Sequence, residues 1–165
     1  MGRVIFKTIV SHTYELPFVL MNLYELHPLC DLLLISESDS THTGRYKGFA
    51  FEESYKKFIL PEFPKAKYVK MHLHQESQVW TNQDLNDQKL RHNEQLTRSS
   101  FVNCLPDISG NDIVISVDGD EVIYGSWRLR SLLQFLKYSR MKSPLAFLLT
   151  LNHMMYFVNL HVVNY

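Results

Sequence analysis

The feature that most constrains this chain is a short apolar run that ends in acids, DIVISVDGDE over residues 112–121. Its β-branched residues predict a strand that is buried on both faces. Asp118 and Asp120 are separated by one residue, so an extended or tightly turned backbone directs both carboxylates the same way. Gly119 between them omits a side chain and lets the backbone approach a ligand. Two such carboxylates indicate a site for Mg²⁺ or Mn²⁺, and this cation would carry a diphosphate.

The same residues also fit a solvent-exposed turn, because Asp-Gly is a common turn and hairpin sequence. The flanking sequence favours the cation site. Ser126 can cap a helix after the acids, and this helix has four leucines that share one face: Leu129, Leu132, Leu133 and Leu136. A strand, an acidic loop and a helix form the crossover unit of α/β proteins, whose ligands bind at the carboxyl ends of the strands.

The remainder of the chain alternates predicted strands with predicted helices. Helices are expected from Leu16, from Glu52 and over residues 81–105, a polar stretch without Gly or Pro. Pro17 suits the first turn of the first helix. The other predicted strands cover residues 3–10, 31–36, 68–73, 145–151 and 155–163. This order predicts one α/β domain over residues 1–165, with a doubly wound, mostly parallel sheet.

A polar segment, ESDSTHTGRYKG, follows the second predicted strand. It has too few apolar residues to pack against a core, so it is either a solvated turn or a ligand-binding loop. Glu37 is expected directly after the strand, where its carboxylate could accept hydrogen bonds from ribose hydroxyls. Thr43 is a second candidate ligand in this loop.

Arg91, Glu94 and Arg98 lie on one face of the predicted helix over residues 81–105. They are either a solvated series of ion pairs or a polar wall over a nucleotide, with the arginines near phosphate or base. The second interpretation is favoured because this helix leads into the strand that presents the acids. His72 and His74 could share one side of a strand end as zinc ligands, but no third ligand lies nearby in the sequence.

The composition excludes several other kinds of protein. Lys+Arg and Asp+Glu both number 17, so no excess of positive charge is present to attract nucleic acid. The two cysteines are too few for a disulfide framework or a structural zinc site. The most apolar stretch, residues 145–163, contains polar residues that would be costly in lipid, so no membrane segment is expected. The first residues lack a secretory signal, which favours a soluble chain.

Several segments together resemble glycosyltransferase family 17, the β-1,4-mannosyl-glycoprotein β-1,4-N-acetylglucosaminyltransferases. YELPFVLMNLYEL resembles the opening Asn-Glu-Leu helix of the family, with Tyr14 in place of the Asn and with Glu15 matching. CDLLLISESDSTHTGRYKGFAF resembles its Glu-Ser, its Thr-x-Thr-Gly and the lysine that follows, here Lys47. NEQLTRSSFVNCL resembles part of its long helix. DIVISVDGDEVI resembles its Asp-x-Asp-Glu metal loop, with Gly119 in place of a larger residue.

This resemblance implies a GT-A-like fold, a UDP-sugar donor that we expect to be UDP-N-acetylglucosamine, and Mn²⁺ or Mg²⁺ at Asp118 and Asp120. The acceptor would be a glycan or glycoprotein. The implied reaction is inverting: a base deprotonates an acceptor hydroxyl, which displaces UDP. The sequence assigns no residue to this base. The expected contacts to the nucleotide sugar come from Glu37, Thr43, Lys47, Arg91, Glu94, Arg98, Asp118, Gly119 and Asp120.

Members of the family continue past the point where this sequence ends, so we expect a truncated or minimal member that lacks part of the acceptor site. The alternative function is therefore a nucleotide-sugar binding module without transfer activity. A metal-dependent phosphohydrolase, which would also use clustered acids, is a third interpretation. Eukaryotic members carry an amino-terminal membrane anchor. Without one, this chain is expected in the cytoplasm as given, or in the Golgi lumen if it is excised from an anchored parent.

Overall fold

The structure, a computed structural model, describes residues 2–73, 91–98, 104–105, 107–109, 112–123, 126–138, 153–154 and 162–163. A parallel sheet of four strands lies at its centre, in the order β3-β2-β1-β4. The strands are β1 Val4–Val10, β2 Leu32–Ser38, β3 Ala66–Met71 and β4 Ile113–Asp118. The predicted α/β fold with a parallel sheet is confirmed.

The strand order changes direction at β1. From β1 the chain builds outward through β2 and β3, and it then returns to pair β4 with the other edge of β1. In open sheets of this type, ligands bind at the carboxyl ends of the strands where the order reverses. The register places Asp118, the last residue of β4, beside Ile9, so the acids at the end of β4 lie at this switch point.

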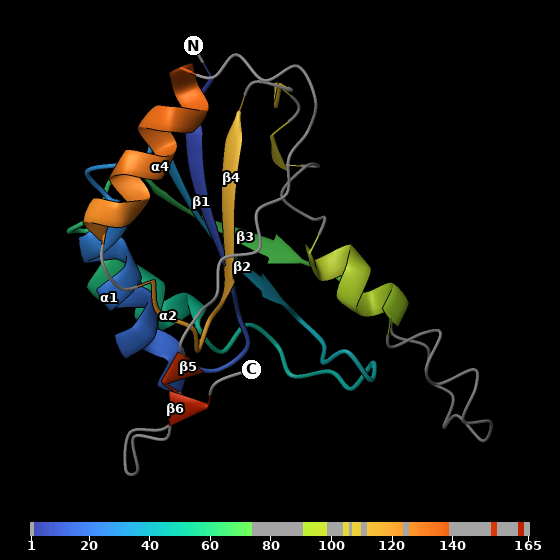
Figure 1. Ribbon diagram of the computed structural model, residues 1–165. Coiled ribbons are helices and arrows are strands. Elements are labelled where there is room, and N and C mark those ends of the chain that lie inside the picture. Colours follow the sequence, from blue (N-terminus) through green and yellow to red (C-terminus); the bar gives the residue numbers. More distant parts are fainter. Residues whose placement is uncertain are drawn as a thin grey trace.

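Three helices, α1 Leu16–Leu26, α2 Glu52–Ser54 and α4 Ser126–Tyr138, cover one face of the sheet (Figure 1). A short 3-10 turn, η1 Thr13–Glu15, leads into α1, and α2 continues as the π-helical segment η2 Tyr55–Ile59. Their apolar side chains pack on the sheet in one large core that includes Phe6, Val10, Leu23, Leu33, Ile35, Phe51, Ile59, Leu129 and Leu133.

The opposite face of the sheet carries a smaller apolar cluster, formed by Ile5, Leu34 and Leu105. Residues 91–98 are helical and lie on this side (Figure 1). Helices therefore cover both faces, as the predicted doubly wound sheet requires. Of the long helix predicted over residues 81–105, residues 81–90 and 99–103 lie outside the described part of the chain.

Four sequence predictions need correction. β2 runs through Ser38, so Glu37 lies inside a strand and not in the loop after it. β3 begins at Ala66, before the predicted start at Tyr68, and ends at Met71. β4 is not buried on both faces, because it is the edge strand of the described sheet and its apolar residues other than Val117 are half-buried.

The fourth correction concerns the end of the chain. The structure has β5 His153–Met154, which lies between the two predicted strands, and β6 Val162–Val163, which lies within the second; they pair in antiparallel orientation. The first of the two predicted strands there, residues 145–151, lies outside the described residues, as do residues 155–161 of the second. In the part of the chain that is described, no helix is both long enough and apolar enough to cross a membrane.

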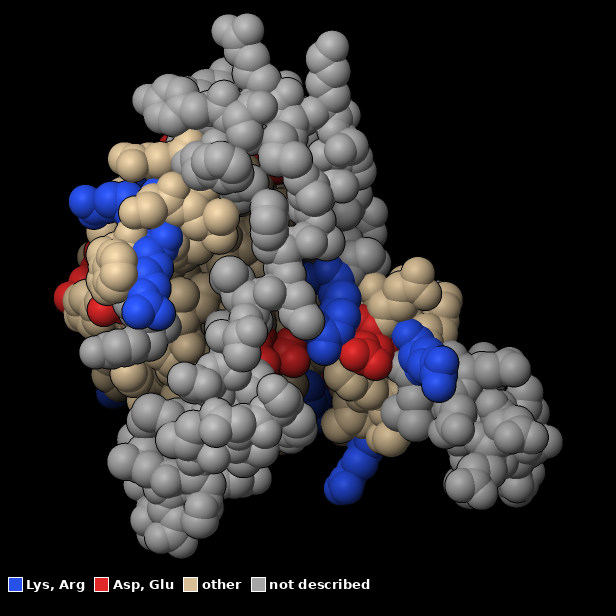
Figure 2. All heavy atoms as spheres, viewed as in Figure 1, with Lys and Arg blue, Asp and Glu red and all other residues tan. Residues whose placement is uncertain are grey.

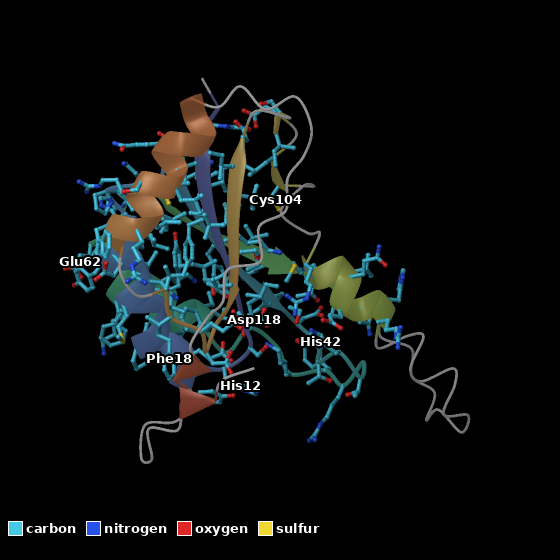
Figure 3. The ribbon with its side chains drawn as sticks, viewed as in Figure 1. His12, Phe18, His42, Glu62, Cys104 and Asp118 are labelled. Carbon is cyan, nitrogen blue, oxygen red and sulfur yellow. The ribbon has the colours of Figure 1, made fainter. Side chains whose placement is uncertain are left out.

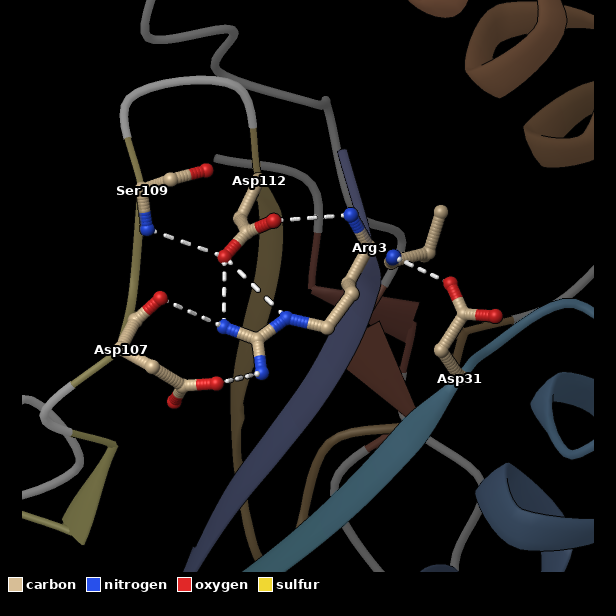
Figure 4. Close-up of polar contacts among 6 residues, drawn as sticks. Arg3, Asp31, Asp107, Ser109 and Asp112 are labelled. Carbon is tan, nitrogen blue, oxygen red and sulfur yellow. Dashed lines mark hydrogen bonds and ion pairs between the residues drawn. The ribbon is translucent and has the colours of Figure 1, made fainter. Parts of the chain in front are cut away.

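A partly buried ion pair between Arg3 and Asp112 fixes β1 against β4 at the amino ends of these strands (Figure 4). The Arg3 guanidinium donates to Asp112 Oδ2 at 2.8 Å, and the Arg3 backbone N–H donates to Asp112 Oδ1 at 2.8 Å. A further bond from the Arg3 guanidinium reaches Asp107 Oδ2 at 2.8 Å. The guanidinium holds the pKa of Asp112 well below its usual range. Because strand register is set along the whole ladder, this pair also aligns the carboxyl ends where the acids lie.

Candidate functional site

A cavity of about 310 Å³ opens at the switch point between β1 and β4. It collects side chains from four separate segments: the loop after β1, the loop after β2, the helix over residues 91–98 and the acidic loop after β4. Figure 3 shows His12, His42 and Asp118 at this end of the sheet. The lining consists of Ile9, Ser11, His12, Tyr14, Glu15, His42, Glu94, Thr97, Arg98, Asp118, Gly119 and Asp120.

The acidic loop is closed by its own hydrogen bonds and held by α1. Glu121 Oε2 accepts from the Asp118 N–H at 3.0 Å, so this third acid of the motif is turned back to the backbone of the loop. Asn22, a fully buried residue of α1, donates to Glu121 O at 2.7 Å and accepts from the Ile123 N–H at 2.8 Å. The loop is therefore fixed on both sides, while Asp118 and Asp120 line the cavity.

Arg98 provides the positive charge opposite these acids. Its Nη1 and Nη2 lie 3.3 Å from Asp118 Oδ1 and Oδ2, and its Nε donates to Glu94 Oε1 at 3.0 Å. In the view of Figure 2, acidic and basic side chains touch near the centre of the molecule, at the place where Figure 3 labels Asp118. Hydrogen bonding to Glu94, and the charge of Asp118, raise the pKa of Arg98. The sequence prediction that Glu94 and Arg98 share a helix face is confirmed.

The contacts between Arg98 and Asp118 are longer than the roughly 2.7–2.9 Å of strong charge-assisted bonds. Both side chains are about half exposed, at 52% and 42%. An arginine held this loosely can turn toward an anionic ligand and leave the carboxylate to another cation.

The donor set fits a hard divalent cation. Asp118 and Asp120 offer carboxylate oxygens, which Mg²⁺ and Mn²⁺ prefer, and such cations often take one or two protein carboxylates together with phosphate and water. Among the described residues, no group of three or more His, Cys, Asp or Glu side chains is arranged to hold a metal ion. In such a site, a bound substrate and water supply the remaining ligands.

Two buried charged residues beside the cavity were not predicted from the sequence as site residues. Glu15, at 6% exposure, accepts from the Ser11 N–H at 2.7 Å, and burial raises its pKa to about 7. Lys7 is fully buried in the middle of β1, and its Nζ donates to the backbone oxygens of Thr97 and Arg98. Burial lowers the pKa of Lys7 to about 8. These hydrogen bonds from Lys7 connect the helix that carries Arg98 to the central strand β1.

An aromatic pair was also missed. The rings of His12 and Tyr14 stack with their centroids 5.1 Å apart and an interplanar angle of 18°, and both residues line the cavity. Tyr14 is 64% exposed. The only available signal was the presence of two aromatic residues in the loop that follows the first strand. This pair gives the cavity a flat, partly apolar surface.

Glu37 and Lys47 lie apart from the cavity lining and bind each other. Glu37 is fully buried, and its Oε1 accepts from Lys47 Nζ at 3.0 Å. Its Oε2 accepts from the Phe51 N–H at 3.0 Å and from the Tyr68 hydroxyl. These bonds anchor the loop that follows β2 onto the sheet. The carboxylate is thus engaged by the protein itself.

The remaining predicted contacts are exposed and do not line the cavity. Thr43 bonds through its hydroxyl to the Thr41 hydroxyl at 2.8 Å. Arg91 is exposed on the helix over residues 91–98. His72 lies 2.8 Å from Asp39 through its Nδ1, and His74 lies outside the described residues. The loop after β2 nevertheless reaches the site, because Asn93 Nδ2 donates to His42 O at 2.9 Å.

The chain was compared with known families and proteins. The family model of Glycosyltransferase family 17 matches residues 1–164. No curated protein and no solved structure matches the chain.

Proposed function

The chain belongs to glycosyltransferase family 17, and on that premise we propose that its cavity binds a UDP-sugar and transfers the sugar to a glycan hydroxyl. The observation that carries this proposal is the meeting of Asp118, Asp120 and Arg98 in one cavity at the switch point between β1 and β4. This is the place where α/β sheets bind nucleotides. Carboxylates beside an arginine suit a diphosphate that is bound through a cation.

In this proposal Asp118 and Asp120 hold Mn²⁺ or Mg²⁺. When bound, the cation would act as a Lewis acid and stabilise the charge of the departing diphosphate. Arg98 leaves Asp118 and donates to a phosphate oxygen, which its planar guanidinium can do with two bonds. Glu94 keeps its bond to Nε and so limits the directions in which Arg98 can turn.

The stacked rings of His12 and Tyr14 support the nucleoside part of the proposal. A flat aromatic surface beside a phosphate site can stack on a nucleobase, and such stacking contributes roughly 1–3 kcal/mol per base. The rings and the acids line the same cavity, which suits a ligand that has a base at one end and a diphosphate at the other. We assign the base to the His12 and Tyr14 side and the diphosphate to the Asp118 side.

We propose UDP-N-acetylglucosamine as the donor and a glycan hydroxyl as the acceptor. A bond forms between the acceptor oxygen and the anomeric carbon of the sugar, while the bond from that carbon to the diphosphate breaks. The acceptor proton leaves to a base, and UDP departs with the bonding electron pair. Attack opposite the leaving group inverts the anomeric configuration.

A product assay tests this proposal. The full chain is incubated with UDP-N-acetylglucosamine, Mn²⁺ and a panel of N-glycan acceptors, and both UDP and glycosylated product are measured. We expect UDP release and product together, with both lost in Asp118→Asn. Donor binding with neither transfer nor hydrolysis would assign the chain to a binding module. Release of inorganic phosphate from simple phosphate esters would indicate a phosphohydrolase.

A further inference from the structure

Glu15 and Gly119 meet where β1 and β4 end. Glu15 is the last residue of η1, and its carboxylate is buried between the loop after β1 and the acidic loop. Its Oε2 accepts from the Ser11 N–H at 2.7 Å. Gly119 is also buried and lies between the two acids that line the cavity.

Glu15 occupies the space that a side chain at position 119 would need. A Cβ placed on Gly119 would overlap Glu15 Oε2 and would lie 3.0 Å from Glu15 Cδ and 2.8 Å from Ile9 O. Cβ atoms essentially never approach other heavy atoms as closely as this one would approach Glu15 Oε2 and Ile9 O. The carboxylate therefore packs directly on the backbone of the acidic loop.

Position 119 needs a glycine because it has no room for a side chain, and not because of its backbone conformation. Among the described residues, the glycines with positive φ are Gly44 and Gly48. Gly119 has a backbone that other residues adopt without strain. Its lack of a side chain is needed because Glu15 and Ile9 O are in the way.

The cost of burying Glu15 points to a role beyond filling space. Removing a carboxylate from water is unfavourable unless hydrogen bonds compensate, and for Glu15 the Ser11 N–H provides one such bond. The oxygen of Glu15 that packs on Gly119 is the one that accepts from Ser11. One side chain thus joins the loop after β1, which carries His12 and Tyr14, to the loop that carries Asp118 and Asp120.

We propose that Glu15 is a positioning residue that joins these two loops and so fixes the distance between the aromatic pair and the acids. The inference rests on the proposed function, in which the two loops hold the two ends of one nucleotide. Loss of Glu15 lets the loops separate. A side chain at position 119 displaces Glu15 and has the same result.

A double-mutant cycle tests this coupling in the full chain. The variants are Glu15→Ala, Gly119→Ala and the double variant, with Glu25→Ala, near the other end of α1, as a control for removing an acid. Unfolding midpoints are measured without ligand, and UDP affinities are measured with Mn²⁺. Each single variant at positions 15 and 119 should lose UDP affinity by on the order of tenfold, and Glu25→Ala should match the parent.

The double variant shows whether Glu15 and Gly119 are coupled. Without Glu15, an alanine at position 119 meets only Ile9 O, so the double variant should bind UDP and resist unfolding better than the sum of the single effects predicts. The excess in affinity should be on the order of tenfold, as for other residues in contact. Strictly additive effects in both measurements would overturn the inference.

The conservative variant Glu15→Gln separates positioning from general stability. It keeps the length of the side chain and an oxygen that accepts from Ser11, so its UDP affinity should stay close to that of the parent. A tenfold loss in Glu15→Gln with an unchanged unfolding midpoint would contradict a positioning role. If the parent itself does not bind UDP, the proposed function fails, and coupling in the ligand-free unfolding midpoints still reports on Glu15 and Gly119.

Discussion

Arg98 and Asp118, which are 20 positions apart in the sequence, face each other in the lining of the cavity, with two nitrogen to oxygen distances of 3.3 Å. The contact joins the helix over residues 91–98 to the end of β4. The positive charge of Arg98 compensates the negative charge of Asp118, which we propose as a ligand of a cation. Its length and exposure allow it to be exchanged for contacts to a ligand.

Arg98→Ala should weaken binding of UDP in the presence of Mn²⁺ by roughly ten- to hundredfold, because a hydrogen bond from a charged group to phosphate is lost. Titration calorimetry measures this affinity. Arg91→Ala, on the same helix but outside the cavity lining, should leave it within about twofold of the parent. Equal losses in both variants would indicate a general effect of helix charge and not a contact from Arg98.

Lys47→Met should destabilise the fold, because it removes the ammonium partner of the buried Glu37 carboxylate. Breaking one side of a buried pair costs about 3–5 kcal/mol, and the remaining bonds from Phe51 and Tyr68 place the expected effect near the lower end. Urea unfolding at pH 7 measures the change. Where the variant is still folded, its UDP affinity should equal that of the parent. A separate loss of affinity would support the predicted contact between this region and the ribose.

Asp112→Asn should lower the stability at pH 7 by roughly 2 kcal/mol, since it weakens charged hydrogen bonds from Arg3. The folded pKa of Asp112 lies below its unfolded value. Its contribution to stability is therefore present above the unfolded pKa and is lost as the pH falls through the folded pKa. Urea unfolding at a series of pH values should show a difference between parent and variant that shrinks toward acid pH. A difference that does not change with pH would contradict the ion-pair account.

Glu15→Gln should change the pH dependence of stability in the opposite direction. Burial raises the folded pKa of Glu15 from its ordinary value to about 7. The protonated form is therefore favoured in the fold, and its contribution is lost as the pH rises through about 7. Measured without divalent cations, Glu15→Gln should gain stability relative to the parent between pH 5 and pH 8. A constant offset over this range would show that Glu15 does not titrate there.

The order of strands and helices along the chain and the position of the acids could be predicted from the sequence, because strands in the sheet leave apolar runs whose ends are visible. The apolar runs that contain Leu33 to Ile35 and Ile113 to Val117 are such signals. The parallel sheet then follows from the alternation with helices. The helix face with Glu94 and Arg98 could be predicted for the same reason, since helical spacing depends only on local sequence.

The charged residues in the interior could not be predicted in this way. Lys7 and Glu37 lie within strands, and their burial depends on partners that are distant in the sequence, at Thr97 and at Lys47. Glu15 resembles an ordinary acid at the start of a helix, a position where solvated carboxylates are common. Its contact with Gly119 exists only because β1 and β4 pair. Contacts between residues that are distant in the sequence cannot be read from the local sequence around either residue.

The most direct test of the central claim is calorimetry of UDP binding with and without Mn²⁺, for the parent and for Asp118→Asn and Asp120→Asn. Asp107→Asn is the control, because this acid is exposed and bonds to Arg3 at the other end of β1. We predict that Mn²⁺ strengthens UDP binding to the parent and to the control, and that each of the other two variants loses most of this gain. Equal UDP affinity with and without Mn²⁺, together with no change in Asp118→Asn, would contradict the account.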